Sequence, residues 1–330
     1  MSNSYRIGPP GQRREIDVRE LKQHVRLSAI VERRVKLRRS GNALSGLCPF
    51  HEERTPSFYV RDELGLYYCH GCGRGGDVIE FVRESTNCRF IEALEWLTLQ
   101  APHTAAPIIE DPGRARLYRQ LHIDQARRIW RDAQPIEGTP AQAYLAARGI
   151  VGRIPGMLRF GFAPVRINPD TGAYGPKLPA MIAACQDVDG SIMGIQRTFL
   201  TRDGTKARMN NPRLSLGQIR GGALRLEPEA STLTLCEGIE DGLSLVRMFP
   251  GMSVWVALGA GNLPFVMLPA SVKRVILAGD ADAPGQAAVA VARQACEARR
   301  LKVEEMYPAG GFGDFNAEWI TLHCPDLNAR

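Results

Sequence analysis

The sequence lacks a segment that would carry it into or across a membrane. Its first thirty residues contain no apolar core of the kind that a secretory signal needs. Residues 250–272 carry no charge, but glycines and prolines break this stretch, so we expect buried strands and turns there and no membrane helix. We therefore expect a protein that is not exported by the signal-peptide route, spans no membrane and works in the cytoplasm.

A disulfide framework is also missing. The chain has 8 cysteines, and five of them lie far apart without a regular spacing: Cys88, Cys185, Cys236, Cys296 and Cys324. Small secreted domains that depend on disulfides space their cysteines densely, whereas proteins of a reducing compartment keep their thiols unpaired. This distribution fits the reducing cytoplasm, and no internal repeat or low-complexity tract stands out.

Length and composition indicate a soluble protein of two or three domains. The 330 residues exceed what one hydrophobic core usually serves, and 44% hydrophobic and 23% charged residues fit a globular protein. The net charge of +7 is uneven, with a crowded basic run at Arg33, Arg34, Lys36, Arg38 and Arg39. Alone, this run would be read as a solvated surface. Beside the motif described next, it favours a polyanionic partner.

The most specific motif is a metal-binding array. A C-x-x-H pair at Cys48 and His51 is followed by a C-x-x-C pair at Cys69 and Cys72. Two ligands in one tight knuckle can grip an ion, and two such knuckles supply the four tetrahedral ligands of a closed zinc site. We expect a structural zinc that folds its domain and takes no part in catalysis. His70 is an alternative ligand, but we expect it at the surface.

A second candidate site consists of acids in the last hundred residues. Glu237 and Asp280 each end an apolar run, and Asp282 follows closely. Carboxylates at the ends of parallel strands can share one site, where Asp280 and Asp282 would offer oxygen ligands to Mg²⁺ and Glu237 would be a ligand or a general acid/base. Asp314, in a glycine-rich loop, could add a further carboxylate. Singly, these acids would be read as helix caps or turn residues, but their combination favours a metal centre.

Apolar periodicity predicts a multidomain α+β and α/β protein. We expect a helix within residues 15–34, a hairpin from 57–60 and 65–69, and two further helices after Asp77. A helix over 114–133 follows a linker, and later strands and helices alternate as in a fold with a mostly parallel sheet. The expected units are listed in chain order: a zinc ribbon (1–100), a linker and helix (101–134), a mixed α/β segment with a hairpin at Asp189 and Gly190 (135–230), and an α/β domain (231–330).

These motifs resemble those of DnaG-type bacterial and phage primases. The segments CPFHEERTPSFYV, YYCHGCGRGGDVIEFV and FIEALEWL are similar to the CHC2 zinc-binding domain of that family. From residue 231 onward, CEG at Glu237 and DADAPG at Asp280 and Asp282 resemble a Toprim domain, the Rossmann-like metal-binding module of primases, topoisomerases and some nucleases. Residues 135–330 are most similar to primase-like Toprim proteins of plasmids, phages and other mobile elements, so 135–230 would be the N-terminal subdomain of a primase core.

The resemblance implies a DNA primase, a nucleotidyltransferase that acts as a DNA-directed RNA polymerase and makes short RNA primers on single-stranded DNA during replication. It assigns catalysis to Glu237, Asp280 and Asp282, which with Asp314 would bind magnesium or manganese. Nucleoside triphosphates and template would contact Arg197, Lys206 and Asn210, which by themselves would be read as solvated surface.

The resemblance also assigns DNA binding to the zinc ribbon. Aromatic side chains would stack on bases while cations follow the phosphates. The residues concerned are Phe58, Tyr59, Tyr67 and Tyr68, together with Arg33, Arg34, Lys36, Arg38 and Arg39. We expect half of these aromatic rings to pack the small core of the ribbon.

Two departures from the family and two alternative functions stay open. The segment before the Toprim-like region is shorter than in replicative primases, and the chain has neither a helicase-binding domain nor a G-x-x-x-x-G-K-[ST] motif, so any replicative helicase would be a separate partner. One alternative is a Toprim nuclease, against which the primase-type zinc motif argues. The other is a non-catalytic zinc-ribbon DNA-binding replication factor, against which the retained acids argue.

Overall fold

The computed structural model describes residues 4–7, 14–72, 74–100, 112–165, 174–209, 211–324 and 327. It divides into two compact units, residues 1–121 (unit 1) and residues 122–330 (unit 2). Helix α5 (Pro112–Asp132) begins in the first unit and ends in the second. No helix in the described part of the chain is both long enough and apolar enough to cross a bilayer.

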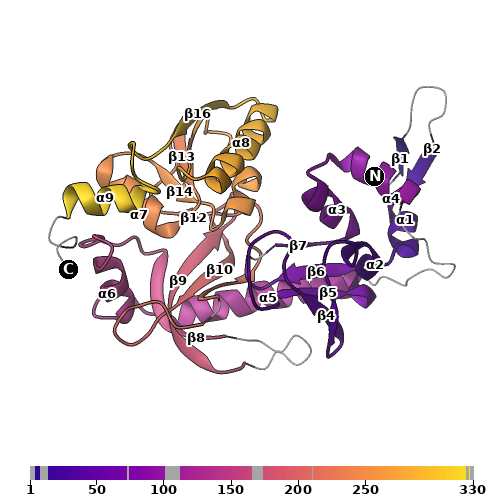
Figure 1. Ribbon diagram of the computed structural model, residues 1–330, viewed down its shortest axis with the longest axis horizontal. Coiled ribbons are helices and arrows are strands. Elements are labelled where there is room, and N and C mark those ends of the chain that lie inside the picture. Colours follow the sequence, from indigo (N-terminus) through magenta and orange to yellow (C-terminus); the bar gives the residue numbers. More distant parts are fainter. Residues whose placement is uncertain are drawn as a thin grey trace. The chain divides into compact units, whose positions relative to one another are not determined.

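Unit 1 is built on an antiparallel five-stranded sheet with the order β3-β4-β5-β6-β7 (Figure 1). Its strands are β3 (Arg38–Ser40), β4 (Ala43–Gly46), β5 (Phe58–Arg61), β6 (Leu66–Cys69) and β7 (Gly75–Gly76). The predicted hairpin is β5 and β6, joined by the short 3₁₀ turn η1 (Asp62–Leu64), after which Gly65 adopts a left-handed conformation with φ of 58°. A glycine meets that requirement without steric cost.

Helices complete the core of unit 1. Helix α3 (Val78–Thr86) starts where predicted, because the Asp77 carboxylate accepts hydrogen bonds from the backbone N–H groups of Ile79 and Glu80. Helix α4 (Phe90–Gln100) follows it. The helix expected within residues 15–34 is present as two short helices, and a strand precedes them. The chain there forms strand β2 (Arg14–Asp17), which pairs with β1 (Ser4–Ile7), and then two short helices, α1 (Val18–His24) and α2 (Leu27–Val31).

The alternation of side chains along β5 and β6 separates buried from outward-facing aromatic rings. Phe58 and Tyr67 are 0% and 2% exposed, and their stacked rings lie 5.2 Å apart at the centre of the unit 1 core. Tyr59 and Tyr68 pair directly across the two strands and are only partly buried. Because neighbouring residues of a strand point to opposite faces, both pairs follow from one register. We therefore do not keep the expectation of DNA contact for Phe58 and Tyr67.

Unit 2 contains two sheets. The first is antiparallel with the order β11-β10-β9-β8, from strands β8 (Leu158–Pro164), β9 (Lys177–Gln186), β10 (Ile192–Phe199) and β11 (Arg213–Gly217). The predicted turn at Asp189 and Gly190 joins β9 to β10. Buried residues of α5 pack on this sheet, and α6 (Pro140–Ala146) contributes Tyr144 to the neighbouring core.

The second sheet of unit 2 has the order β12-β14-β13-β15-β16, and its last four strands are parallel. The strands are β12 (Leu224–Arg225), β13 (Thr232–Cys236), β14 (Val254–Val256), β15 (Arg274–Ala278) and β16 (Lys302–Met306). After β13 the chain passes to β14 on one side and then returns to β15 on the other. This reversal beside β13 creates the crevice in which open α/β sheets bind ligands.

Helices cover both faces of the second sheet (Figure 1). Alternate positions such as Cys236 and Val256 face the core that contains α7 (Ile239–Met248) and Phe315 of α9 (Phe315–His323). The intervening positions, such as Leu235, face α8 (Ala283–Ala298) and the 3₁₀ segment η2 (Ala260–Phe265). The result is a three-layer α/β domain in which two apolar faces hold the strand ends in place.

We expect Phe58→Ala to destabilise the zinc-loaded protein by about 3 kcal/mol, because it removes a ring at the centre of the unit 1 core. Tyr59→Ala, one residue away on the outer face, should cost less than about 1 kcal/mol. Urea unfolding of unit 1, followed by tyrosine fluorescence, measures both. Equal losses for the two variants would contradict the register described here.

Candidate functional site

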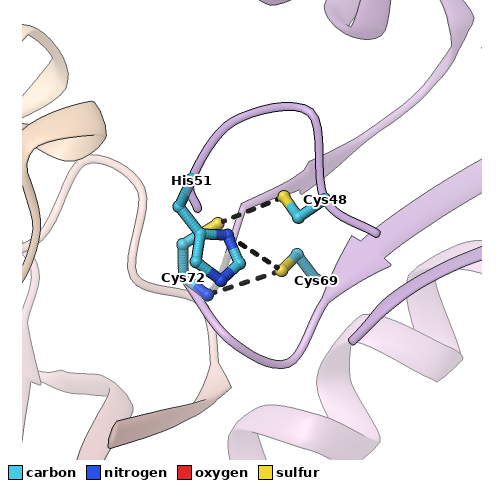
Figure 2. Close-up of side chains that lie close together, drawn as sticks. All are labelled: Cys48, His51, Cys69 and Cys72. Atoms are coloured by element: carbon cyan, nitrogen blue, oxygen red, sulfur yellow. Dashed lines mark hydrogen bonds between the residues drawn. The ribbon is translucent and has the colours of Figure 1, made fainter. Parts of the chain in front are cut away.

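The four predicted zinc ligands converge on one point. Ligand atoms of Cys48, His51, Cys69 and Cys72 all lie within 4.8 Å of one another, the only such group in the described part of the chain. The two thiols of Cys48 and Cys72 are 3.9 Å apart, and Nδ1 of His51 is 3.8 Å from the sulfur of Cys69 (Figure 2). Ligands of one tetrahedral zinc ion lie roughly 3.3–3.8 Å from each other, so this set fits that ion.

The local backbone shapes this cluster. The backbone N–H groups of Phe50 and Cys72 donate to the sulfurs of Cys48 and Cys69 at 3.4 Å, which favours the thiolate form that binds a metal. Gly71 leaves room for the imidazole, because a Cβ at this position would lie 2.5 Å from Nε2 of His51. The knuckles therefore need both their ligands and this glycine.

Glu53 is a residue of the zinc site that the sequence reasoning missed. Its side chain is 2% exposed. One carboxylate oxygen accepts from the backbone N–H groups of Cys48 (2.7 Å) and Ser57 (3.0 Å), and the other accepts from the Ser57 hydroxyl and lies 3.2 Å from Nε2 of His51. A carboxylate behind the distal nitrogen orients a ligating histidine. Glu53 thus ties both residues of the first knuckle together and leaves Nδ1 of His51 facing the thiols.

The outer face of the ribbon carries an aromatic group. The His70 ring lies 5.4 Å from that of Tyr59 and 4.9 Å from that of Tyr68, in edge-on contact with both. The expectation that His70 is not a zinc ligand agrees with this position. The basic run is exposed at every predicted position: Arg33, Arg34, Lys36, Arg38 and Arg39.

The predicted acids of unit 2 gather at one edge of its parallel sheet. Glu237 directly follows β13, and Asp280 lies just beyond β15, its neighbour in the sheet. Burial, together with the charges of Glu237, Asp314 and Asp282, raises the pKa of Asp280 to about 6. Burial and the charge of Asp282 also raise the pKa of Glu237. The carboxylates therefore repel one another and form a site that favours a cation.

Asp241 belongs to the same acidic edge, although the sequence analysis did not single it out. Burial and the charges of Asp280 and Asp314 raise its pKa to about 7. Asp241 lies four residues after Glu237, on the first turn of α7, while Glu237 itself precedes that helix. That spacing is the sequence signal that could have identified it. We call Glu237, Asp241, Asp280, Asp282 and Asp314 the acidic cluster.

Two members of the acidic cluster also cap helices. Asp282 accepts from the backbone N–H of Gly285 at the start of α8, and Asp314 accepts from that of Ala317 at the start of α9. The helix-cap interpretation thus holds for both residues. Each cap uses one carboxylate oxygen, so the second oxygen is still available to bind a cation. The carboxylates do not converge as tightly as the zinc ligands. This spacing suits a hydrated ion such as Mg²⁺, which keeps several waters and takes few protein ligands.

The three predicted nucleotide-binding residues have different surroundings. Arg197 is 2% exposed and donates to the backbone carbonyls of Pro164, Ser215 and Leu214, so its guanidinium stabilises the antiparallel sheet. Lys206 is exposed, with Nζ 6.0 Å from the ring centre of Tyr144. Asn210 lies outside the described residues. Among the described residues of this set, Lys206 is the one whose charged group is exposed to solvent.

Comparisons with known proteins match three parts of the chain. Family models match a CHC2 zinc finger at residues 13–107, a domain of unknown function (DUF7146) at 120–226 and a Toprim domain at 232–320. The DNA primases of Mycobacterium tuberculosis and Thermotoga maritima are each 34% identical, over 155 and 150 residues. The matches cover 45% of this chain and 24% and 26% of those proteins.

The resemblance to DnaG-type primases is confirmed. The chain carries a CHC2 zinc ribbon and a Toprim domain, and it spans about a quarter of the length of the curated relatives it matches. Among solved structures, the zinc-binding and RNA polymerase domains of Aquifex aeolicus primase are similar over 94% of this chain and 84% of that one, with 20% identity and a TM-score of 0.43. The primase fragment of the bacteriophage T7 primase-helicase protein matches 83% and 93%, with 13% identity and a TM-score of 0.39.

Glu53→Gln should weaken zinc binding by the CHC2 ribbon about tenfold to 100-fold, because the amide no longer orients His51 as the carboxylate does. Glu52→Gln, at the exposed neighbouring position, is the matched control and should leave the affinity unchanged. Competition against a chromophoric chelator measures both. If both variants keep the zinc affinity of the original chain, Glu53 has no part in the site.

The Toprim domain should lose stability as pH rises when no metal is added. The raised pKa values of Asp241 (about 7) and Asp280 (about 6) mean that the folded state holds more protons than the unfolded chain between about pH 4 and pH 7. Stability then falls with increasing pH, by on the order of 2 kcal/mol between pH 5 and pH 8, and Mg²⁺ should restore part of it at pH 8.

Thermal unfolding of the zinc-loaded full chain, without and with added Mg²⁺, checks this pH dependence. Asp241→Asn should flatten the pH profile, whereas Asp189→Asn, at an exposed turn, should not. A metal-free stability that does not change from pH 5 to pH 8 would rule out the strong mutual repulsion that we infer for the acidic cluster.

Proposed function

We propose that this protein is a DNA primase, which synthesises short RNA primers on single-stranded DNA from nucleoside triphosphates. The observation that supports it most is the presence, on one chain, of a primase-type zinc ribbon and a Toprim domain with its carboxylates at the edge of the sheet. The relatives named DNA primase support the same activity, although they are much longer proteins.

The acidic cluster is the proposed catalytic centre. A magnesium or manganese ion held by Glu237, Asp280 and Asp282, with Asp314 near by, would activate the attacking 3′-hydroxyl and stabilise charge on the leaving pyrophosphate. We add Asp241 to these residues because its carboxyl is coupled to Asp280 and Asp314. The carboxylates are already positioned and partly buried at the edge of the sheet in the folded chain. The protein would therefore need little reorganisation to bind the cation.

The CHC2 ribbon is the proposed contact with template. Cys48, His51, Cys69 and Cys72 would hold a structural zinc, as their geometry allows. Tyr59 and Tyr68 are the rings proposed to stack on bases, and His70 contacts both of them edge-on. The exposed basic run at Arg33, Arg34, Lys36, Arg38 and Arg39 would follow the phosphates.

The remaining partners follow from this activity. Lys206 is the accessible cation proposed to meet the nucleotide or the template backbone. A replicative helicase is a further proposed partner. A DNA template, together with cysteines that are all unbridged, fits the cytoplasmic location expected from the sequence.

Primer synthesis on a mixed-sequence single-stranded template, with labelled ribonucleotides and either Mg²⁺ or Mn²⁺, tests the proposal. We expect short RNA from the original chain and a loss of at least about 100-fold in Asp280→Ala, because that change removes a carboxylate from the acidic cluster. Asp189→Ala, at an exposed turn, should keep full activity.

Each other outcome has a definite meaning. Shortened template in place of RNA would identify a Toprim nuclease. DNA binding without either product, in protein that is folded and loaded with zinc, would identify a non-catalytic replication factor.

A further inference from the structure

Glu240 is a buried carboxylate that the proposed chemistry does not use. It lies on the first turn of α7, next to Asp241 of the acidic cluster, and is 7% exposed. A buried charge is strongly unfavourable unless it is paired. Glu240 is paired twice: Nη2 of Arg213, on β11, donates to it at 2.6 Å, and the hydroxyl of Tyr144, on α6, donates to the same oxygen.

These bonds keep Glu240 charged in spite of its burial. The guanidinium of Arg213 and the hydroxyl of Tyr144 supply the charged and polar partners that a buried carboxylate needs. Tyr144 is fully buried, so the hydroxyl has little freedom to turn away. One fixed carboxylate therefore holds the guanidinium of Arg213 in one orientation.

Two more cations surround the same ring. The guanidinium carbon of Arg148 lies 3.7 Å from the centre of the Tyr144 ring, and Nζ of Lys206 lies 6.0 Å from it. Nε of Arg148 is also 3.9 Å from Glu240. Three cations thus share one buried carboxylate, which leaves an excess of positive charge at this place in unit 2. Burial and the charges of Arg213 and Arg148 accordingly lower the pKa of Lys206.

The excess charge lies beside the acidic cluster. Arg213 donates to Glu240, and Glu240 is the residue next to Asp241 of the acidic cluster on the first turn of α7. Nε of Arg213 is buried and has no hydrogen-bond partner among the described residues. A ligand that carries several negative charges and also binds the cation of the acidic cluster would satisfy both sides of this arrangement.

We propose that Glu240 and Tyr144 are positioning residues that hold Arg213, with Arg148 and Lys206 beside it, as a binding site for the polyphosphate chain of a nucleotide. This inference rests on the proposed function, since it places the triphosphate of the substrate next to the carboxylates that react with it. Glu240 neutralises one of three close cations, and without it their repulsion would displace Arg213 from the site.

The first test is binding without catalysis. Full-length protein is titrated with inorganic tripolyphosphate, and with a non-hydrolysable nucleoside triphosphate in Mg²⁺, by calorimetry and without template. We expect the original chain to bind both, and Glu240→Gln and Tyr144→Phe to weaken the affinity about tenfold. Glu229→Gln, which changes an exposed carboxylate elsewhere in unit 2, should bind like the original chain.

The second test separates positioning from a general loss of structure. In primer synthesis, Glu240→Gln and Tyr144→Phe should raise KM for the nucleotide about tenfold and change kcat much less, while DNA affinity stays constant. Arg213→Lys keeps the charge but loses the fork that Glu240 orients, so it should show the same rise in KM. If Glu240→Gln fails to fold, as its unfolding temperature will show, Tyr144→Phe and Arg213→Lys carry the test.

The outcomes distinguish this inference from the proposed function. Primer synthesis with an unchanged KM in folded Tyr144→Phe and Arg213→Lys would overturn the positioning role and leave the primase proposal intact. Failure of the original chain to bind tripolyphosphate or nucleotide would overturn the binding site itself. Polyphosphate binding that weakens in the variants, in a chain that makes no primers, would support the site and count against the primase.

Discussion

Repulsion among the carboxylates of the acidic cluster is the constraint around which unit 2 is organised. The fold brings them together because β13 and β15 are adjacent and parallel, and because the chain reverses direction beside β13. The charge is only partly relieved within the protein: Asp282 and Asp314 face helix N-termini, while Asp241 and Asp280 have raised pKa values. Negative charge that the protein does not neutralise is stabilised when a cation binds. A metal-dependent enzyme needs a site with this property.

The two metal centres meet opposite requirements. At the zinc site the ligand atoms lie within 4.8 Å of each other, with Glu53 behind them, and the geometry leaves no position for a substrate. At the acidic cluster the carboxylates lie farther apart and leave room for water and phosphate oxygens. Under the proposed function, the same chain uses a closed centre to hold a fold and an open centre to bind reactants. The difference follows from the ligands and their positions. The zinc site has soft ligands in two tight turns, whereas the acidic cluster has hard oxygen ligands near strand ends.

The features that the sequence predicted correctly depend on short-range spacing. Short local patterns of a few residues predict each of these features: the zinc knuckles, the hairpin of β5 and β6, the Asp77 cap and the parallel sheet. Glu53 bonds to near neighbours in its own segment, but no spacing rule in the sequence distinguishes it from an ordinary surface acid. Glu240 was missed because its partners, Arg213 and Tyr144, are brought near only by the fold. The burial of Arg197 was missed for a similar reason: three backbone carbonyls of neighbouring strands, invisible in sequence, accept its hydrogen bonds. The split between Phe58 and Tyr59 could have been predicted, since strand alternation alone requires it.

The β5–β6 hairpin also limits how this protein can vary in length. Its strands run between the two zinc knuckles, Cys69 ends β6, and Tyr59 pairs with Tyr68. An insertion of one residue within either strand would turn the following side chains to the opposite face, exchanging Tyr68 with Tyr67 and moving Cys69 away from its ligand position. Substitutions on the outer face leave this arrangement intact. Related proteins can therefore change the side chains on this outer surface, but single-residue insertions and deletions within the two strands should be eliminated by selection.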